Sequence, residues 1–242
     1  MDWTPMFNEF AQVLTVYKPT DGSYCYATTG WPGMYGAFTA LNEHSVYLDL
    51  HDGTSMGGSV IYTGRPSILN QLSDLITEVA SLPALVKRLN GIATSASNIL
   101  TVGDETGGAS MECSSLGGNR LRKPEGESLV VVNSFLNPDW GLGQRETVSN
   151  SLRRLSNMTA RLAENEGSVD AQVTRDLMDL TLFDADGNFL ENGGCTKPTL
   201  QDADSTNYQT VFDVQRRQLW MKVPAPTAFA DWTHFDLNAL WS

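Results

Sequence analysis

The sequence predicts an α+β fold in which antiparallel sheets pack with helices in layers. Stretches with strand-like alternation and β-branched residues cluster in three parts of the chain, and stretches with helical periodicity fill the two gaps between them. Strands and helices therefore do not alternate one by one, as they would in a doubly wound parallel sheet. The chain has 242 residues and 41% hydrophobic content, which is enough to bury a substantial core.

The first cluster of strands lies before residue 54. The run "EFAQVLTVYKP" (9–19) mixes alternation with β-branched residues and ends at a proline, and "SYCYATTG" (23–30) follows after a Thr-Asp-Gly turn. These two runs predict a hairpin. Two further β-rich runs within "WPGMYGAFTALNEHSVYLDLHDG" (31–53) flank a turn-like Asn-Glu-His, so the sheet is expected to continue.

Helices are predicted next. Apolar residues between Ser67 and Leu89 recur at spacings of three and four, and Pro83 fits the first turn of a second helix. After them, "ILTVGDETGGASMEC" (99–113) places a Gly-rich turn between two short strands. The nearly continuous apolar run "ESLVVVNSF" (127–135) predicts a strand buried on both faces.

The last third of the chain predicts two more helices and a final hairpin. The helices are expected from about Glu146 to Leu162 and from a cap at Ser168 toward Leu182. The runs "TNYQTVFD" and "RRQLWMKVP" predict the hairpin, and the aromatic tail "DWTHFDLNALWS" should dock on the body. No repeat or linker divides the chain, so residues 1–242 are expected to form a single domain.

The charge and hydropathy of the chain exclude several classes of function. There are 16 basic and 28 acidic side chains, and the formal net charge of -12 repels nucleic-acid phosphates and anionic membrane surfaces. No apolar run approaches the roughly 20 residues that span a bilayer, and no export signal is present. These features predict a soluble protein, cytoplasmic by default, with neither nucleic acid nor membrane as a partner.

The cysteines and histidines form no recognisable metal-binding pattern. Cys25, Cys113 and Cys195 are far apart, and no CxxC or HExxH sequence occurs, so we expect reduced thiols and no metal site. No base or cation near Cys25 in the sequence would hold its thiolate, and Cys195 is interpreted as a loop residue. The segment "DADGNF" (184–189) fails as a calcium loop, because Phe189 stands where that loop needs glycine.

Four segments of the sequence indicate a family when their order and spacing are considered together. They are "WPGMYGAFTALNEHSVYLDLHDG", "LVVVNSFLNPDWG", "NSLRRL" and "TNYQTVFDVQRRQLWMKV". As an ordered set they resemble the choloylglycine hydrolase and penicillin acyltransferase-like branch of the N-terminal nucleophile hydrolases, over nearly the whole chain. The resemblance implies a four-layer αββα sandwich with two antiparallel sheets between helical layers. It also implies hydrolysis or acyl transfer at the linear amide bond of a small-molecule N-acyl amide, without a cofactor.

The resemblance also implies a mechanism and its residues. An N-terminal cysteine attacks the amide carbonyl, and its own α-amine, whose reference pKa is about 7.7 to 8.0, accepts and returns the proton. The orienting carboxylate falls at Asp2, an amide for the oxyanion or the amine falls at Asn133, and a cation beside the cysteine falls at Arg154. Arg153 is the alternative cation, because the doubled arginine leaves the register open.

A further asparagine of the family falls at His51 or Asp52 of this chain. A histidine can still donate a hydrogen bond to a substrate or an oxyanion, whereas an ionised aspartate cannot. Both residues are therefore kept as candidates for substrate or oxyanion binding.

The opening residues "MDW" match the second half of a "GRNMDW"-like motif that follows the cysteine in this family. The resemblance therefore implies that the first strand and its nucleophile are absent from this chain, which would then be inactive as given. A second hypothesis is a non-catalytic module that binds acyl amides or another protein, and a third is a hydrolase that uses Cys195 or Cys25. An unpaired strand edge would also make a homo-oligomer possible.

Overall fold

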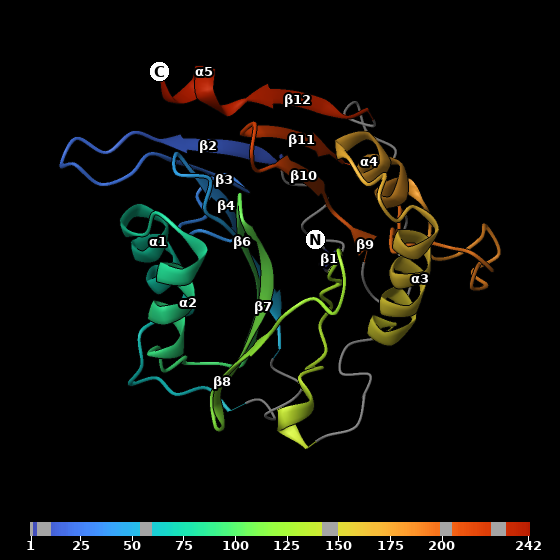
Figure 1. The fold of residues 1–242 in the computed structure, drawn as a ribbon, viewed down its shortest axis with the longest axis horizontal. Coiled ribbons are helices and arrows are strands. Elements are labelled where there is room, and N and C mark those ends of the chain that lie inside the picture. Colours follow the sequence, from blue (N-terminus) through green and yellow to red (C-terminus); the bar gives the residue numbers. More distant parts are fainter. Residues whose placement is uncertain (1, 4–10, 54–59, 142–149, 199–204, 224–230) are drawn as a thin grey trace.

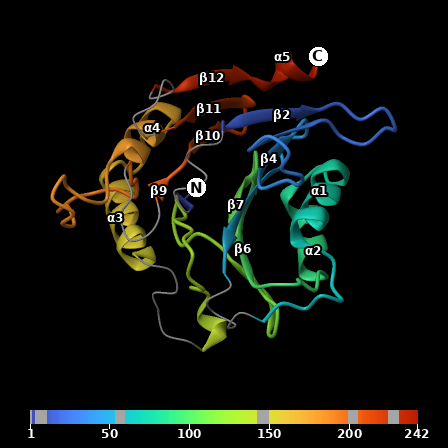
Figure 2. The ribbon, with the colours of Figure 1, turned by 180° about the vertical axis from the view of Figure 1, so that it is seen from behind.

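Two antiparallel sheets between helical layers form the framework of the protein (Figure 1). The computed structural model describes residues 2–3, 11–53, 60–141, 150–198, 205–223 and 231–242. Helices α1 and α2 lie on the outer side of the larger sheet, the smaller sheet lies on its other side, and α3 and α4 lie beyond (Figures 1 and 2). The predicted four-layer arrangement is confirmed.

The larger sheet contains seven strands in the order of the sequence, each antiparallel to the next. The predicted hairpins of the first half of the chain are all present in it. Its strands are β2 (Val13–Tyr17), β3 (Tyr26–Gly30), β4 (Thr39–Asn42), β5 (Tyr47–Asp52), β6 (Asn98–Asp104), β7 (Gly107–Ser114) and β8 (Gly118–Arg122).

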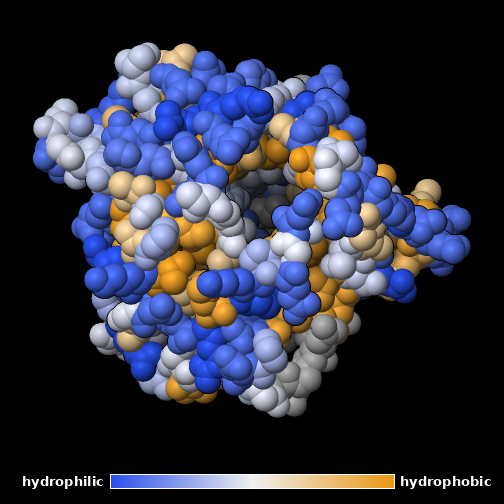
Figure 3. Space-filling model, in the orientation of Figure 1, coloured by the Kyte–Doolittle hydropathy of each residue, from blue (hydrophilic) through white to orange (hydrophobic). Residues whose placement is uncertain are grey.

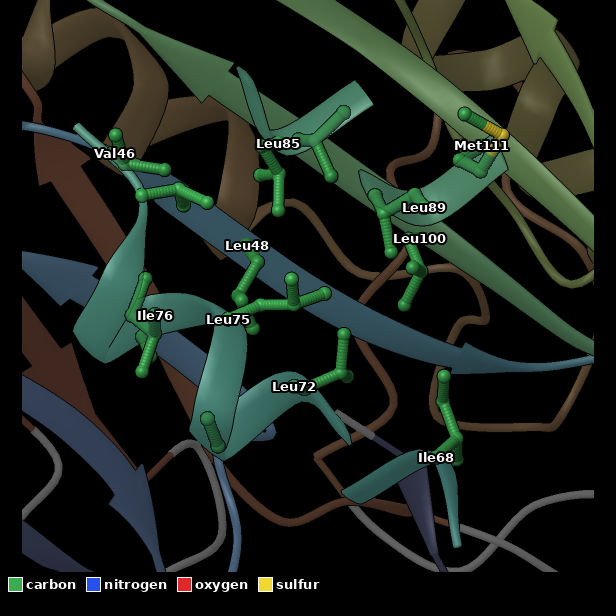
Figure 4. Packing of buried hydrophobic residues seen from close by; sticks show 14 of the residues in the cluster. Val46, Leu48, Ile68, Leu72, Leu75, Ile76, Leu85, Leu89, Leu100 and Met111 are labelled. Atoms are coloured by element: carbon green, nitrogen blue, oxygen red, sulfur yellow. The ribbon is translucent and has the colours of Figure 1, made fainter. Parts of the chain in front are cut away.

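Helices α1 (Ile68–Glu78) and α2 (Leu82–Asn90) cover the outer face of this sheet. As predicted, Pro83 stands in the first turn of α2, where the Ser81 side chain accepts a hydrogen bond from the Ala84 amide. Apolar side chains from both helices interlock with those of the strands (Figure 4). The fully buried ones include Leu48, Leu72, Leu75, Ile76, Leu85, Leu89, Leu100 and Met111.

The smaller sheet comes from the end of the chain. It contains β10 (Gln209–Asp213), β11 (Gln218–Lys222) and β12 (Thr233–Asp236), and α5 (Leu237–Trp241) follows β12. The short strand β9 (Ser205–Thr206) precedes β10 and pairs antiparallel with β1 (Asp2–Trp3). The predicted final hairpin is therefore confirmed, and the tail docks through the buried Leu237.

The second pair of helices differs slightly from the prediction. Helix α3 spans Ser151–Glu164, and part of its predicted start lies outside the described residues. Helix α4 (Ala171–Asp179) begins after Asp170, not at Ser168, because the Asp170 carboxylate accepts hydrogen bonds from the amides of Gln172 and Val173 at 2.8 Å each.

The prediction of a buried strand over 127–135 is wrong. This segment crosses β7 and β8 without joining either sheet, although Val132 and Phe135 are buried. Side chains of the larger sheet contact this part of the chain: Arg122 donates to the Val130 carbonyl, and Glu112 accepts hydrogen bonds from the amides of Leu136 and Asn137 directly after the segment. Apolar composition predicted the burial of the segment correctly but not its partners.

A cluster of polar contacts links the turns of the two sheets. Arg217, in the β10–β11 turn, donates to the Ser45 hydroxyl at 3.0 Å and to Asn238 at 3.3 Å, and it lies 3.7 Å from Glu105. Ser45 in turn donates to Glu105 at 2.7 Å. The turns after β4, β6 and β10 are therefore linked, although they are far apart in the sequence.

We expect Arg217→Ala to lower the free energy of unfolding by about 1–2 kcal/mol, because two hydrogen bonds and one ion pair are lost. Arg216→Ala is the matched control, since its single ion pair with Asp213 is exposed and should contribute less than about 0.5 kcal/mol. Urea unfolding of both variants measures the difference. Equal losses would show that the link between the turns does not stabilise the fold.

Candidate active site between the sheets

A row of polar side chains crosses the larger sheet on the face opposite α1 and α2. Directly opposed residues of antiparallel strands project to the same face, and Leu48, Leu100 and Met111 point to the helices, so their sequence neighbours point away from them. Cross-strand pairing therefore aligns six polar residues on the inner face. They are Thr29, Thr39, Asp49, Thr101, Ser110 and Arg122.

The neighbouring row on the same face is apolar. Ala27, Leu41 and Tyr47 oppose one another there, and Tyr47 packs on Phe212 of the smaller sheet with 5.2 Å between ring centroids. This half of the face holds the two sheets together. The polar half is thus the part of the inner face that can serve chemistry.

Asp49 and His51 are the central polar pair of this face. The Thr39 hydroxyl donates to one Asp49 oxygen at 2.6 Å, and the other oxygen lies 3.3 Å from His51 Nε2. His51 Nε2 is also 2.9 Å from the Thr101 hydroxyl. Each of the two side chains keeps 22% of its surface exposed, so both remain accessible to a small molecule.

Burial and nearby charge shift the pKa values of this cluster. Burial lowers the pKa of His51, the Asp49 carboxylate opposes that shift, and the Arg154 guanidinium adds to it. Tyr208, which is buried beside Thr29 and Thr39, has a raised pKa chiefly because of its burial. At neutral pH His51 is therefore mainly neutral and Tyr208 is fully protonated.

Asn133 and Arg154 meet in the structure. Arg154 Nη2 donates to the Asn133 side-chain oxygen at 3.3 Å, and Asn133 Nδ2 donates to the backbone carbonyl of Asp52 at 3.0 Å. The candidates Asn133, Arg154 and Asp52 thus lie together at the end of β5, next to His51. The exposed Asp52 takes part through its backbone in this contact.

Arg153 takes a different place. Its guanidinium lies over the Phe189 ring, 4.6 Å from the centroid, on the segment that follows α4. The structure therefore favours Arg154 over Arg153 as the cation next to Asn133. Asp2 lies in β1, opposite Thr206 of β9.

Two serines that the sequence did not single out align Asn133 with Arg154. The Ser134 and Ser151 hydroxyls are 2.7 Å apart, and both side chains are buried. One serine follows Asn133 and the other begins α3, three residues before Arg154. Their contact fixes the distance between the two elements. Small polar residues beside candidate site residues are the only signal that could have identified them.

A buried carboxylate holds the segment that carries Asn133. The fully buried Glu112 of β7 accepts hydrogen bonds from the amides of Leu136 and Asn137 at 2.8 and 3.1 Å, and from Trp140 Nε1 at 2.5 Å. Arg122 lies 3.5 Å away as its counter-ion. Nothing in the sequence predicted this anchor, because a glutamate in a strand is usually exposed.

Gly53 allows this segment to cross the end of β5. A Cβ atom at this position would lie 2.8 Å from Phe135 Cε2, closer than real Cβ contacts. The close approach places the Asn133 segment directly over the strand that carries Asp49 and His51. The surface is hollowed in this region, near β1 and the start of β10 (Figure 3).

The three cysteines differ in their environment. Cys113 is buried, and burial together with Glu112 raises the pKa of its thiol to about 12. Burial, followed by the Glu43 carboxylate, also raises the pKa of Cys25, which opposes thiolate formation. Cys195 is half-buried, and its neighbour Gly194 accepts a hydrogen bond from Asn157. The structure thus argues against Cys25 and Cys113 as nucleophiles.

Two features are absent from the described part of the chain. No cluster of three or more potential metal ligands occurs among these residues. Within the same residues, every helix is too short or too polar to cross a bilayer.

Known structures share this architecture. An arginine-to-leucine variant of the conjugated bile acid hydrolase from Clostridium perfringens matches with a TM-score of 0.62 and 11% identity, over 99% of this chain and 88% of that chain. A cysteine-to-alanine mutant of the same hydrolase matches with a TM-score of 0.58 and 9% identity, over 96% and 86%. This chain has the N-terminal nucleophile hydrolase fold.

A further solved structure is less similar to this chain. Penicillin V acylase from Agrobacterium tumefaciens matches with a TM-score of 0.48 and 12% identity, over 98% of this chain and 77% of that chain. No family model and no curated protein matches the sequence. The fold of this chain is therefore shown by structural similarity and not by sequence similarity.

We expect Glu112→Ala to lower the free energy of unfolding by about 3–5 kcal/mol, because three buried donors and the Arg122 charge lose their partner. Glu112→Gln keeps the volume and loses the charge, and it should cost about 2–3 kcal/mol. Glu127→Ala is the control, since Glu127 is exposed. Urea unfolding measures all three, and an effect of Glu112→Gln as small as that of the control would contradict the anchor.

Alkylation provides a second check. At pH 8 the Cys113 thiolate fraction is roughly 10⁻⁴ of the total, and the side chain is buried, so iodoacetamide should not modify it in the folded protein. In urea all three cysteines should react. Mass spectrometry of digested samples locates the label, and rapid labelling of Cys113 without urea would show that this part of the sheet opens readily.

Proposed function

We propose that this chain is the main part of a hydrolase or acyltransferase for the linear amide bond of small N-acyl amides. Its nucleophile is an N-terminal cysteine supplied by residues ahead of Met1. The contact between Asn133 and Arg154 carries the proposal, because these two residues are 21 positions apart and were assigned to one site by the resemblance.

The assigned roles agree with the chemistry of these groups. Arg154 is a cation that can lower the pKa of a nearby thiol and stabilise its thiolate. The Asn133 side chain accepts from Arg154 and donates to the Asp52 carbonyl, so its amide is held in one orientation. A fixed amide is the kind of donor that stabilises an oxyanion or holds the α-amine. Asp2 is the proposed carboxylate that orients the α-amine.

The register of β1 supports a segment ahead of Met1. Asp2 opposes Thr206 and Trp3 opposes Ser205 in an antiparallel pair. A residue ahead of Asp2 in the same register would therefore lie opposite the residues that lead from Thr206 into β10. Among the described strands, β10 pairs only with β11 and ends its sheet. A strand leading into Asp2 would therefore extend along the open edge of β10 and complete the sheet.

The solved structures support the reaction class through their names only. The matched protein from Clostridium perfringens is described as a conjugated bile acid hydrolase, and one matched form is a mutant of a cysteine near its start. The proposal for this chain keeps the broader class of N-acyl amides, since pocket shape sets selectivity within one fold.

The test is to express the reading frame together with the codons ahead of Met1 and to measure amine release from a panel of N-acyl amides. The longer chain should release amine, and the 242-residue chain should bind the same amides without turnover, because removing a nucleophile removes the covalent route. An in-frame stop codon directly ahead of Met1, or no amine release by the longer chain, would refute the hydrolase. Binding without turnover by both chains would instead support a non-catalytic binding module.

In the active longer chain, Arg154→Ala and Asn133→Ala should each lower kcat by about 10²–10³-fold, as loss of an electrostatic contact at the reacting atoms does. Arg153→Ala should change kcat less than about threefold, because its partner is Phe189. Arg161→Ala, on the same helix but paired with the exposed Glu164, is the control. A larger loss for Arg153→Ala than for Arg154→Ala would reverse the assignment.

A further inference from the structure

His51 is one of the two positions, with Asp52, at which the resemblance places an asparagine, and its contacts point to a different role. The residue lies on the inner face of β5, on the same strand as Asp49 and beside the contact of Asn133 with the Asp52 carbonyl. Resting on the proposed function, we propose that His51 is the base that activates the hydrolytic water, with Asp49 as the positioning residue that orients its ring.

The contacts of Nε2 select one tautomer of the ring. Asp49 Oδ2 lies 3.3 Å from Nε2, and Asp49 is also held by the Thr39 hydroxyl at 2.6 Å. A hydrogen on Nε2 faces this carboxylate favourably, whereas a lone pair there would face a negative charge. The hydrogen bond of Nε2 is made with the Thr101 hydroxyl at 2.9 Å, and in this tautomer the hydroxyl oxygen accepts the hydrogen. The charge of the nearby Asp49 carboxylate therefore favours the hydrogen on Nε2.

The other ring nitrogen is left for the substrate. Among the described residues Nδ1 has no hydrogen-bond partner, and the side chain is partly exposed on the face between the sheets. In the neutral ring with hydrogen on Nε2, Nδ1 carries a lone pair and accepts a proton. A neutral His51 cannot donate from Nδ1 to an oxyanion, so the resemblance to an asparagine donor does not carry over.

The step can be written with all atoms balanced. After the cysteine has been acylated, a water oxygen bonds to the thioester carbon while Nδ1 takes a water proton. The carbon–sulfur bond then breaks, and its electron pair leaves on sulfur as thiolate. The imidazolium finally returns its proton to the thiolate. Asp49 stabilises the imidazolium formed in between, and Arg154 is the other described charged group that faces the ring.

The first test uses the 242-residue chain and needs no activity. Nitrogen-15 NMR of the imidazole rings should show hydrogen on Nε2 of His51 and a pKa below 6.5, and His51→Gln identifies its signal. Asp49→Asn removes the charge that raises this pKa, so the pKa should fall further and the tautomer preference should weaken. Hydrogen on Nδ1, or a pKa of 6.5 or higher, would overturn the proposal.

The second test uses the active longer chain. His51→Gln should lower kcat by about 10²-fold, remove the acidic limb of the pH profile of kcat and let the acyl-enzyme accumulate for detection by mass spectrometry. Asp49→Asn should lower kcat by about tenfold and shift that limb to lower pH. His234→Gln, on the exposed edge strand β12, is the matched control and should leave all three readouts unchanged.

The outcomes separate this inference from the proposed function. An active longer chain in which His51→Gln keeps its kcat and its pH profile overturns the role of His51 and leaves the hydrolase intact. A longer chain without activity overturns the hydrolase, and the role of His51 as its base falls with it. In that case the NMR measurement still shows whether Asp49 orients the ring.

Discussion

The carboxylate of Glu112 is the constraint on which the arrangement between the sheets depends. A charge buried on the face of a sheet is costly unless donors surround it, and here the donors come from the backbone of Leu136 and Asn137 and from the indole of Trp140. If the segment that carries Asn133 moved away, the buried Glu112 carboxylate would lose these hydrogen-bond donors. The Ser134–Ser151 contact transmits this fixed position to α3 and to Arg154.

The larger sheet uses its two faces for different purposes. Its outer face is mainly apolar and forms the core with α1 and α2, and Asn42 and Asn119 on this face donate hydrogen bonds to carbonyls at the ends of the two helices. The inner face is divided into an apolar row, which packs on the smaller sheet, and an adjacent polar row that includes Asp49. A shift of β5 by one residue would turn its apolar side chains away from α1 and α2 and toward the smaller sheet. The packing of these apolar side chains therefore also fixes the direction in which Asp49 and His51 point.

The sequence predicted most of the fold because its periodicities are local. The hairpins of the larger sheet, the two helices split at Pro83 and the final hairpin each carry their own turn or cap. The segment 127–135 was predicted wrongly because its apolar residues indicate burial and not the element that buries them. In the candidate site, the resemblance supplied Asn133 and Arg154, whereas Glu112, Ser134 and Ser151 could not be predicted. The partners described above lie 10 or more positions away, and no pattern of residue types marks such pairs.

Burial and the charges around His51 set the protonation state of its ring. Asp49 and Arg154 act on the ring in opposite directions, and burial adds to the effect of Arg154, so the ring is neutral near neutral pH. A neutral ring with its hydrogen on Nε2 donates from Nε2 and accepts a proton at Nδ1. An asparagine at the same position would be a donor at every pH. The proposed role of His51 therefore depends on a side chain that can change its protonation state at the end of β5, which an amide cannot do.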